Sequence, residues 1–292
     1  YMTTDISPEG LVRVYEAIGR EATGRVAVKI STGEPGGKNF LQPSLIKNLV
    51  QKVNGTIVEC NVAYQGPRFT SEAHYQAAKD HGFTAIAEVD IMDAPGEMKI
   101  PVKDTTHIKY NLVGDHIDNY DFMINLAHFK GHAMGGFGGV LKNQSIGVAS
   151  ANGKAYIHTA GKTADKNLIW KENRDVPQDH FIEAMAASAQ SVHDYFKGKI
   201  LYINVMNNLS VDCDCNNHPA DPEMKDVGIL ASTDPVALDQ ACVDLVFNYP
   251  SQEGDDAKAL IERINSRHGV HIIEHAAAIG LGSREYELVR ID

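Results

Sequence analysis

Residues 120–143 read YDFMINLAHFKGHAMGGFGGVLKN, and the character of this stretch changes after its first eight residues. Residues 120–127 form a mostly apolar run of the length expected for a buried strand. Residues 128–143 follow at once and hold five glycines, two histidines, two lysines and an asparagine. In open α/β sheets, ligands bind beyond the carboxyl ends of the strands. The stretch therefore predicts a central strand that leads into a functional loop.

The rest of the chain alternates between short β-branched runs and amphipathic segments. The apolar runs predict strands at residues 25–30, 55–62, 84–91, 199–205, 227–231 and 286–290. Helical periodicity predicts helices at residues 7–21, 43–53, 71–81, 179–196, 235–247, 256–267 and 271–279. Thr233 or Asp234 is expected to cap the helix that Pro235 begins. This alternation predicts an α/β fold, with a mostly parallel or mixed sheet that helices cover on both faces.

The remaining segments carry weaker signals. Residues 131–176 are rich in glycine, lysine and asparagine and have little periodicity, which predicts mainly loops. Residues 207–225 form a second polar loop after a predicted strand. Neither a repeat nor a low-complexity linker is present, so we expect a single domain over residues 1–292, with a two-lobed arrangement as the alternative.

The composition excludes several classes of protein. Lysine and arginine number 27 and aspartate and glutamate 38, which gives a formal net charge of −11. Without a long basic run, the chain is not expected to bind nucleic acid. No apolar stretch approaches the ~18 residues of a membrane helix, and no signal peptide is visible. We therefore expect a cytoplasmic protein without a membrane partner, with a leader removed before Tyr1 as the alternative.

The glycine-rich segment has the composition of an anion-binding loop. Glycines let the backbone approach a ligand closely, and exposed N–H groups beside lysines attract anions. The segment is neither a P-loop nor a G-x-G-x-x-G fingerprint, since Leu141 stands where the last glycine would be. We expect His132 and Lys130 to transfer protons. A small anionic substrate is expected to bind Lys29, Arg68, Gly135, Gly136, Gly138, Gly139, Lys142 and Asn143. A structural glycine-rich turn is the alternative.

The second polar loop contains the pair of cysteines in VDCDCNNH, residues 211–218. In an extended backbone, C-x-C spacing points both sulfurs to the same side. Thiolates and imidazole suit zinc or iron, so the candidate metal ligands are Cys213, Cys215, His218 and His128. A redox-active thiol pair and two passive loop cysteines are the other interpretations. The C-x-x-C-x-x-C run of a ferredoxin-type cluster does not occur.

Polar residues inside predicted helices are interpreted as surface groups. Asp239 is expected to be a charge on a helix face, and His271 and His275 to lie on a solvated helix surface. A lone histidine such as His158 is likewise expected at the surface.

Several stretches together resemble domain-of-unknown-function family 362. They are VAVKISTGEPGG, ECNVAYQGPR, LAHFKGHAMGGFGGVLKNQSIGVAS, DCDCNN and DVGILASTDPVALDQACVDLV, between about residues 25 and 246. The family is described as iron–sulfur-associated, because many members carry a ferredoxin-like insert after the glycine-rich segment. Residues 161–178 of this chain contain no cysteine, so the resemblance does not extend to such clusters. It implies a shared fold and a shared site, but no reaction.

These observations favour a metal-dependent enzyme, with a Cys/His site beside a lysine- and glycine-rich loop that binds a carboxylate or phosphate. The metal would polarise a substrate oxygen or activate water. One alternative is a redox protein that uses Cys213 and Cys215 or receives electrons from a separate ferredoxin-like partner. Another is a non-catalytic anion-binding module. The sequence predicts no oligomeric state.

Overall fold

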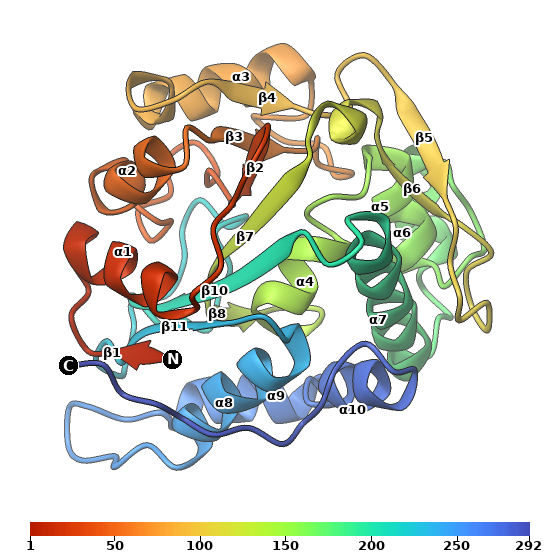
Figure 1. The fold of residues 1–292 in the computed structure, drawn as a ribbon. Coiled ribbons are helices and arrows are strands. Elements are labelled where there is room, and N and C mark those ends of the chain that lie inside the picture. The colour runs from red at the N-terminus through yellow and green to blue at the C-terminus, as the bar shows by residue number, and fades with distance from the viewer.

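The apolar run that precedes the glycine-rich segment forms the central strand of a seven-stranded sheet. This strand is β7 (Phe122–His128) in the computed structural model, which describes residues 1–292 (Figure 1). The sheet has the order β1-β11-β10-β7-β2-β3-β4. Its other strands are β1 (Met2–Thr3), β2 (Val26–Lys29), β3 (Thr56–Glu59), β4 (Val89–Ile91), β10 (Ile200–Met206) and β11 (Gly228–Ser232). The strands from β10 to β4 run parallel, and β11 pairs antiparallel with both β10 and β1, which confirms a mixed sheet.

Alternate residues of β7 face two separate apolar cores. Ile124 and Leu126 pack with residues of α1 (Pro8–Ala17) and α2 (Pro43–Lys52). Met123 and Ala127 belong to the core on the opposite face. Figure 1 shows α1 and α2 on one side of the sheet and the helices of the second core on the other. A strand buried on both faces needs apolar residues at successive positions, which explains why its sequence lacks polar alternation.

The second core is built mainly from helices of the carboxyl-terminal two thirds of the chain. These helices are α4 (Val140–Ser145), α5 (Ala151–His158), α7 (Gln178–Tyr195), α8 (Pro235–Phe247), α9 (Lys258–Ser266) and α10 (His271–Ala278). The short helix α6 (Ile169–Glu172) instead contributes Ile169 to a small separate cluster with Ala63 and Ala155. The predicted cap of α8 is confirmed, because the Asp234 carboxylate accepts from the N–H groups of Val236 and Ala237. The model therefore confirms an α/β fold with helices on both faces of its sheet. None of its helices combines the length and apolar character needed to cross a membrane.

The prediction of mainly loops over residues 131–176 is wrong. This stretch holds α4, α5 and α6, the 3-10 helix η3 (Lys166–Leu168), and a hairpin of β8 (Lys130–His132) and β9 (Gly136–Gly138). Almost every residue of α5 is buried, so the helix has no polar face to produce a periodic pattern. Ser150 caps α5 by accepting from the N–H of Gly153 at 2.9 Å.

Two predicted strands are also corrected. Residues 83–85 form the 3-10 helix η1 (Phe83–Ala85), so the strand expected at residues 84–91 is limited to β4. Residues 286–290 form no strand, and Arg290 makes only an isolated bridge to Met2. The neighbouring edge strand β1 is two residues long and offers little backbone for pairing. The remaining small elements are α3 (Ser71–Asp80), β5 (Glu97–Ile100), β6 (Asn111–Gly114) and η2 (Asp115–Asn119).

Asp239 is fully buried, which corrects its interpretation as a surface charge on a helix. Its carboxylate accepts from the backbone N–H groups of Val140 and Leu141, each at 3.0 Å, and from Asn204 Nδ2 at 2.7 Å. It thereby caps α4 from a position almost 100 residues further along the chain. Burial raises the pKa of Asp239 to about 6, although these three donors oppose the shift.

Replacing Asp239 by Asn is expected to lower the free energy of unfolding by about 1–3 kcal/mol. The amide would present an NH₂ group to one of the two backbone donors and leave it unsatisfied in the core. Guanidinium unfolding at pH 7 measures the change. Asp175, an exposed residue before α7, provides the matched control, and Asp175→Asn is expected to unfold like the wild type. Equal stability of Asp239→Asn and wild type would contradict the capping role.

Candidate functional site

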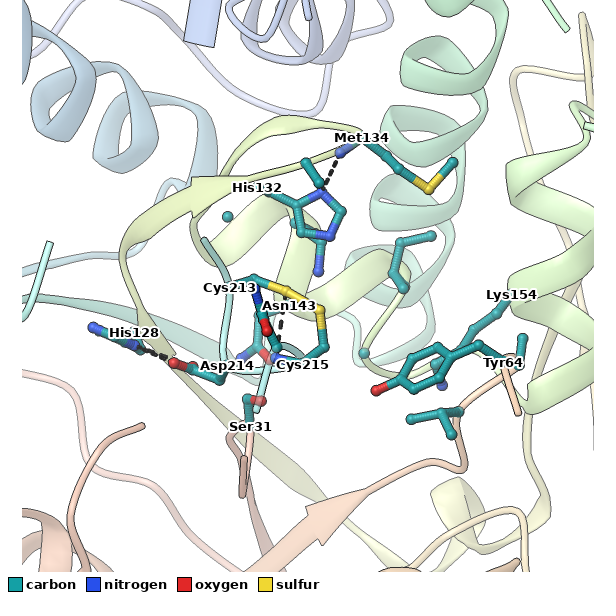
Figure 2. Close-up of a pocket in the computed structure, with 18 of the residues that line it drawn as sticks. Ser31, Tyr64, His128, His132, Met134, Asn143, Lys154, Cys213, Asp214 and Cys215 are labelled. Atoms are coloured by element: carbon teal, nitrogen blue, oxygen red, sulfur yellow. Dashed lines mark hydrogen bonds and ion pairs between the residues drawn. A yellow bond between two sulfur atoms is a disulfide. The ribbon is translucent and has the colours of Figure 1, made fainter. Parts of the chain in front are cut away.

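The sheet order places a crevice between β2 and β7. After β2 the chain continues outward to β3 and β4, whereas β7 and β10 lie on the other side of β2. Ligands in open α/β sheets bind at such a point, beyond the carboxyl ends of the strands. A cavity of about 450 Å³ lies here, between Lys29 at the end of β2 and His128 at the end of β7 (Figure 2). This volume is within the range of small-molecule sites.

The two predicted functional loops meet at this cavity. Among the expected site residues, its walls contain Lys29, Arg68, His128, Lys130, His132, Gly138, Gly139, Lys142, Asn143, Cys213 and Cys215. Gly135, Gly136 and His218 do not line it. Sequence reasoning missed further wall residues, among them Lys154 and His158 of α5, Glu59 and Trp170. Lys154 and His158 are one helical turn apart, a spacing that would have shown a shared face had α5 been recognised.

Cys213 and Cys215 form a disulfide in the cavity wall. Figure 2 shows both sulfurs beside the ring of His132. One ring nitrogen of His132 and the two sulfur atoms all lie within 4.8 Å of one another. Cys213 is buried and Cys215 is partly exposed, so Cys215 is the more accessible of the two. The C-x-C spacing thus places both sulfurs on one side, next to a histidine of the glycine-rich segment.

The hydrogen bonds of His132 fix which ring nitrogen carries the proton. Its Nδ1 accepts from the backbone N–H groups of Met134 at 3.2 Å and Gly135 at 2.9 Å. Burial, and then the nearby positive charge of Lys142, lower the pKa of His132 well below its usual value. The ring is therefore neutral at pH 7, with its proton on Nε2. In a metal site, the ligating nitrogen has no proton and the other ring nitrogen donates its N–H to an acceptor. In His132, Nδ1 instead accepts from backbone N–H groups and Nε2 carries the proton.

His128, an expected metal ligand, lies outside the group of His132, Cys213 and Cys215, and both of its ring nitrogens have partners. Nδ1 lies 2.9 Å from the Asp214 carboxylate and Nε2 lies 2.6 Å from the carbonyl oxygen of Asn207. Both partners are acceptors, so both nitrogens donate in this structure. Lys130 Nζ lies 3.1 Å from the other Asp214 oxygen. Although burial opposes ionisation, these two cations hold the pKa of Asp214 well below its ordinary value.

This ion-paired group gives Asp214, the residue between the two cysteines, a structural role. It fastens the cysteine loop to the end of β7 and the start of β8. His218, another expected metal ligand, is exposed and lies outside the group of His132, Cys213 and Cys215.

Several backbone N–H groups of the glycine-rich segment have partners within the chain. The N–H of Gly135 donates to His132, and those of Val140 and Leu141 donate to Asp239. Gly136 has a φ of +84°, and an added Cβ would lie 2.9 Å from the Gly269 Cα. Gly135 and Gly136 therefore serve the turn between β8 and β9, and side chains supply the positive charge in the cavity.

Most of the basic residues in the cavity wall are neutralised by carboxylates. Lys29 Nζ lies 3.2 Å from Glu59, and Lys130 pairs with Asp214. Arg68, an expected substrate ligand, is held by Glu34 at 2.6 Å and by the hydroxyl of Tyr64. Its guanidinium is therefore used mainly to hold the cavity wall together.

Lys142 and Lys154 have no carboxylate partner. The Lys154 ammonium donates to the carbonyl oxygens of Ala149 at 2.6 Å and Cys60 at 3.4 Å, whereas the Lys142 ammonium makes no hydrogen bond or ion pair. Burial, and then the neighbouring charges of Lys130 and Lys29, lower the pKa of Lys142 to about 7. Lys142 is thus a cavity residue that can both attract an anion and exchange a proton at neutral pH.

The comparisons with known proteins establish the family but no activity. No curated protein matches the chain. A solved structure, the lactate racemase apoprotein from Thermoanaerobacterium thermosaccharolyticum, is similar with a TM-score of 0.48 and 14% sequence identity. The matched region covers 84% of this chain and 56% of that one. The family model described as "Domain of unknown function (DUF362)" matches residues 26–244. The resemblance seen in the sequence is therefore confirmed, and the chain belongs to the DUF362 family.

Proposed function

We propose that the protein is a thiol–disulfide oxidoreductase for a small thiol that carries a carboxylate. The observation that carries this proposal is the Cys213–Cys215 disulfide in the wall of a cavity of about 450 Å³. We therefore rank the redox interpretation of Cys213 and Cys215 above their interpretation as metal ligands. The unpaired ammonium of Lys142 and the carbonyl-bound ammonium of Lys154 supply the charge that attracts the carboxylate.

The first step is attack on the more accessible sulfur. The incoming thiol loses its proton to solvent, and the resulting thiolate attacks Cys215 Sγ. The Cys213–Cys215 bond breaks, and its electron pair goes to Cys213 Sγ. The Nε2–H of His132 stabilises this thiolate by a hydrogen bond. The Lys142 ammonium then gives a proton to the Cys213 thiolate and regains one from solvent.

A second substrate thiol completes the exchange. It attacks the substrate sulfur of the mixed disulfide and releases Cys215 as a thiol. The sum is one protein disulfide and two substrate thiols giving one protein dithiol and one substrate disulfide. Protons and electrons balance, and the reverse reaction oxidises the dithiol by the same route.

Thiol counting and turnover test the proposal together. Alkylation of the denatured chain is expected to find two thiols, Cys60 and Cys242, before mild reduction and four afterwards. A carboxylate-bearing thiol is expected to react at least about tenfold faster than a neutral thiol of equal thiol pKa. Cys213→Ser and Cys215→Ser abolish the exchange, and Cys242→Ser, a buried cysteine outside the cavity, retains it. Four free thiols in the air-exposed protein, or exchange by Cys213→Ser, would refute the proposal.

A metal-dependent enzyme is the second candidate, favoured by one specific observation. A nitrogen of His132 and the two sulfurs of the disulfide lie within 4.8 Å of one another, so reduction would leave two thiols beside this histidine. Two cysteines with one histidine hold catalytic zinc in some enzymes. The Nε2–H of His132 would have to be lost first, which lowers the affinity for zinc. Tight binding of one zinc ion by the reduced protein, lost in Cys215→Ser, would support this candidate. Reduced protein that binds no zinc through its thiols would leave only the redox proposal.

A further inference from the structure

A second group of histidines and carboxylates lies outside the cavity, where α7 and α10 pack together. His271 and His275 are one turn apart on α10 and both face Glu183 of α7. The sequence suggests a solvated surface here, but the side chains of His271, His275 and Glu183 are only 20%, 18% and 21% exposed. The segment between β5 and β6 completes the group with Asp104 and His107.

The carboxylate of Glu183 stands at the centre of three imidazole rings. Its Oε1 lies 2.9 Å from His271 Nε2 and 3.9 Å from His275 Nδ1. Its Oε2 lies 2.6 Å from His107 Nε2. The ligand atoms of Glu183, His271 and His275 all lie within 4.8 Å of one another, so small side-chain rotations would bring them around one ion.

In both His271 and His275, the ring nitrogen farther from Glu183 contacts another carboxylate, as is expected of histidines in a metal site. His275 Nε2 lies 2.8 Å from the Asp104 carboxylate, and His271 Nδ1 lies 3.4 Å from that of Glu274. Each ring directs one nitrogen to the Glu183 carboxylate and the other to an outer carboxylate, so a metal ion would displace the proton that the inner nitrogen shares with Glu183. Histidine ligands of metals generally have this second partner, which fixes the tautomer and strengthens the ligand.

We propose that Glu183, His271 and His275 form a binding site for a divalent transition metal such as zinc, with His107 as the fourth donor. Imidazole nitrogen and carboxylate oxygen are both zinc ligands, and the three carboxylates of Glu183, Asp104 and Glu274 favour a cation. The site contrasts with His132, whose Nδ1 accepts from backbone N–H groups. A bound ion would join α7, α10 and the segment between β5 and β6, and would stabilise their packing.

Zinc binding to a chain without the reactive cysteines tests this site by itself. In the Cys213→Ser/Cys215→Ser background, calorimetric titration with Zn²⁺ is expected to show one saturable site. His271→Ala and His275→Ala each weaken it by at least about tenfold, and Asp104→Asn by about tenfold through the orientation of His275. His116→Ala is the matched control, because His116 also contacts a carboxylate, at 2.8 Å from Asp90, but belongs to no such group. Its affinity for zinc is expected to equal that of the parent.

Two further measurements distinguish a loss of zinc ligands from a folding defect of the alanine variants. Glu183→Gln preserves the shape of the side chain and is also expected to lose at least about tenfold in affinity, with an unchanged circular dichroism spectrum. Co²⁺ in place of Zn²⁺ is expected to give visible d–d bands without a thiolate charge-transfer band. Absence of saturable binding, or binding that survives both His271→Ala and His275→Ala, would overturn the proposal.

Discussion

Replacing Glu59 by Gln is expected to lower the free energy of unfolding by about 3–5 kcal/mol, because a buried cation then loses its counter-charge. Glu59 and Lys29 are both almost fully buried, with Oε2 and Nζ 3.2 Å apart. Oε1 accepts from the N–H of Thr32 at 2.7 Å and from its hydroxyl at 2.9 Å. Guanidinium unfolding at pH 7 measures the change. Asp221→Asn removes an exposed ion pair with Lys38 and is expected to leave the stability unchanged.

The pH dependence of stability tests the ion pair of Glu59 in a second way. Burial alone would raise its pKa, but Lys29, His74 and Arg68 outweigh burial and hold the pKa well below its ordinary value of 4.5. A carboxyl with a lowered pKa stabilises the fold above its unfolded pKa, and this contribution is lost as the pH falls below about 4.5. Wild type is therefore expected to lose more stability than Glu59→Gln between pH 5 and pH 3. Parallel curves for the two proteins would contradict the ion-pair explanation.

The contribution of Asp239 to stability is expected to depend on pH in the opposite direction. It is buried without a cation, and its pKa is raised to about 6. A raised pKa means that the folded state holds the proton more tightly than the unfolded chain, so this contribution to stability is lost as the pH rises through about 6. Burial has the same sign for both carboxyls, and the positive charges beside Glu59 account for the difference.

Replacing Lys142 by Met is expected to weaken the binding of a small carboxylate by about 10–100-fold at pH 6, the contribution of a hydrogen bond to a charged group. The pKa of Lys142 is about 7, so the amine is charged at pH 6 and mostly neutral at pH 9. In wild type, affinity should therefore rise as the pH falls from 9 to 6, and this rise should be much smaller in Lys142→Met. Calorimetry measures both the affinity at pH 6 and its pH dependence. The ligand is the S-methyl thioether of a carboxylate-bearing thiol, which binds without reacting.

An exposed lysine on a neighbouring helix provides the control for this experiment. Lys171 of α6 is 76% exposed and lies next to Trp170, a residue of the cavity wall. Lys171→Met is expected to bind the carboxylate as wild type does at each pH. Equal affinities of wild type and Lys142→Met at pH 6 would exclude Lys142 from anion binding.

Local sequence patterns were sufficient to predict the main strands and helices of the fold. The apolar run in residues 120–127 predicts β7 because a strand buried on both faces has no polar alternation. The cap of α8 was visible because Asp234 and its partners Val236 and Ala237 are neighbours in the chain. The C-x-C spacing likewise predicts two sulfurs on one side, since a single intervening residue fixes their relation.

Contacts between distant residues decided the rest. The sequence could not show α4, because its cap, Asp239, lies almost 100 residues away. Nor could it show that both ring nitrogens of His128 have partners, whereas only Nδ1 of His132 has partners within the protein.

The family, the alternation of strands and helices and the two polar segments at the carboxyl edge of the sheet follow from the amino-acid sequence alone. Which side chains of those segments remain chemically available depends on the fold. Lys130 and Lys142 look alike in the sequence, yet Asp214 neutralises one and nothing neutralises the other. The reason is that charge pairing depends on distance in space, and the fold sets this distance between residues far apart in the chain.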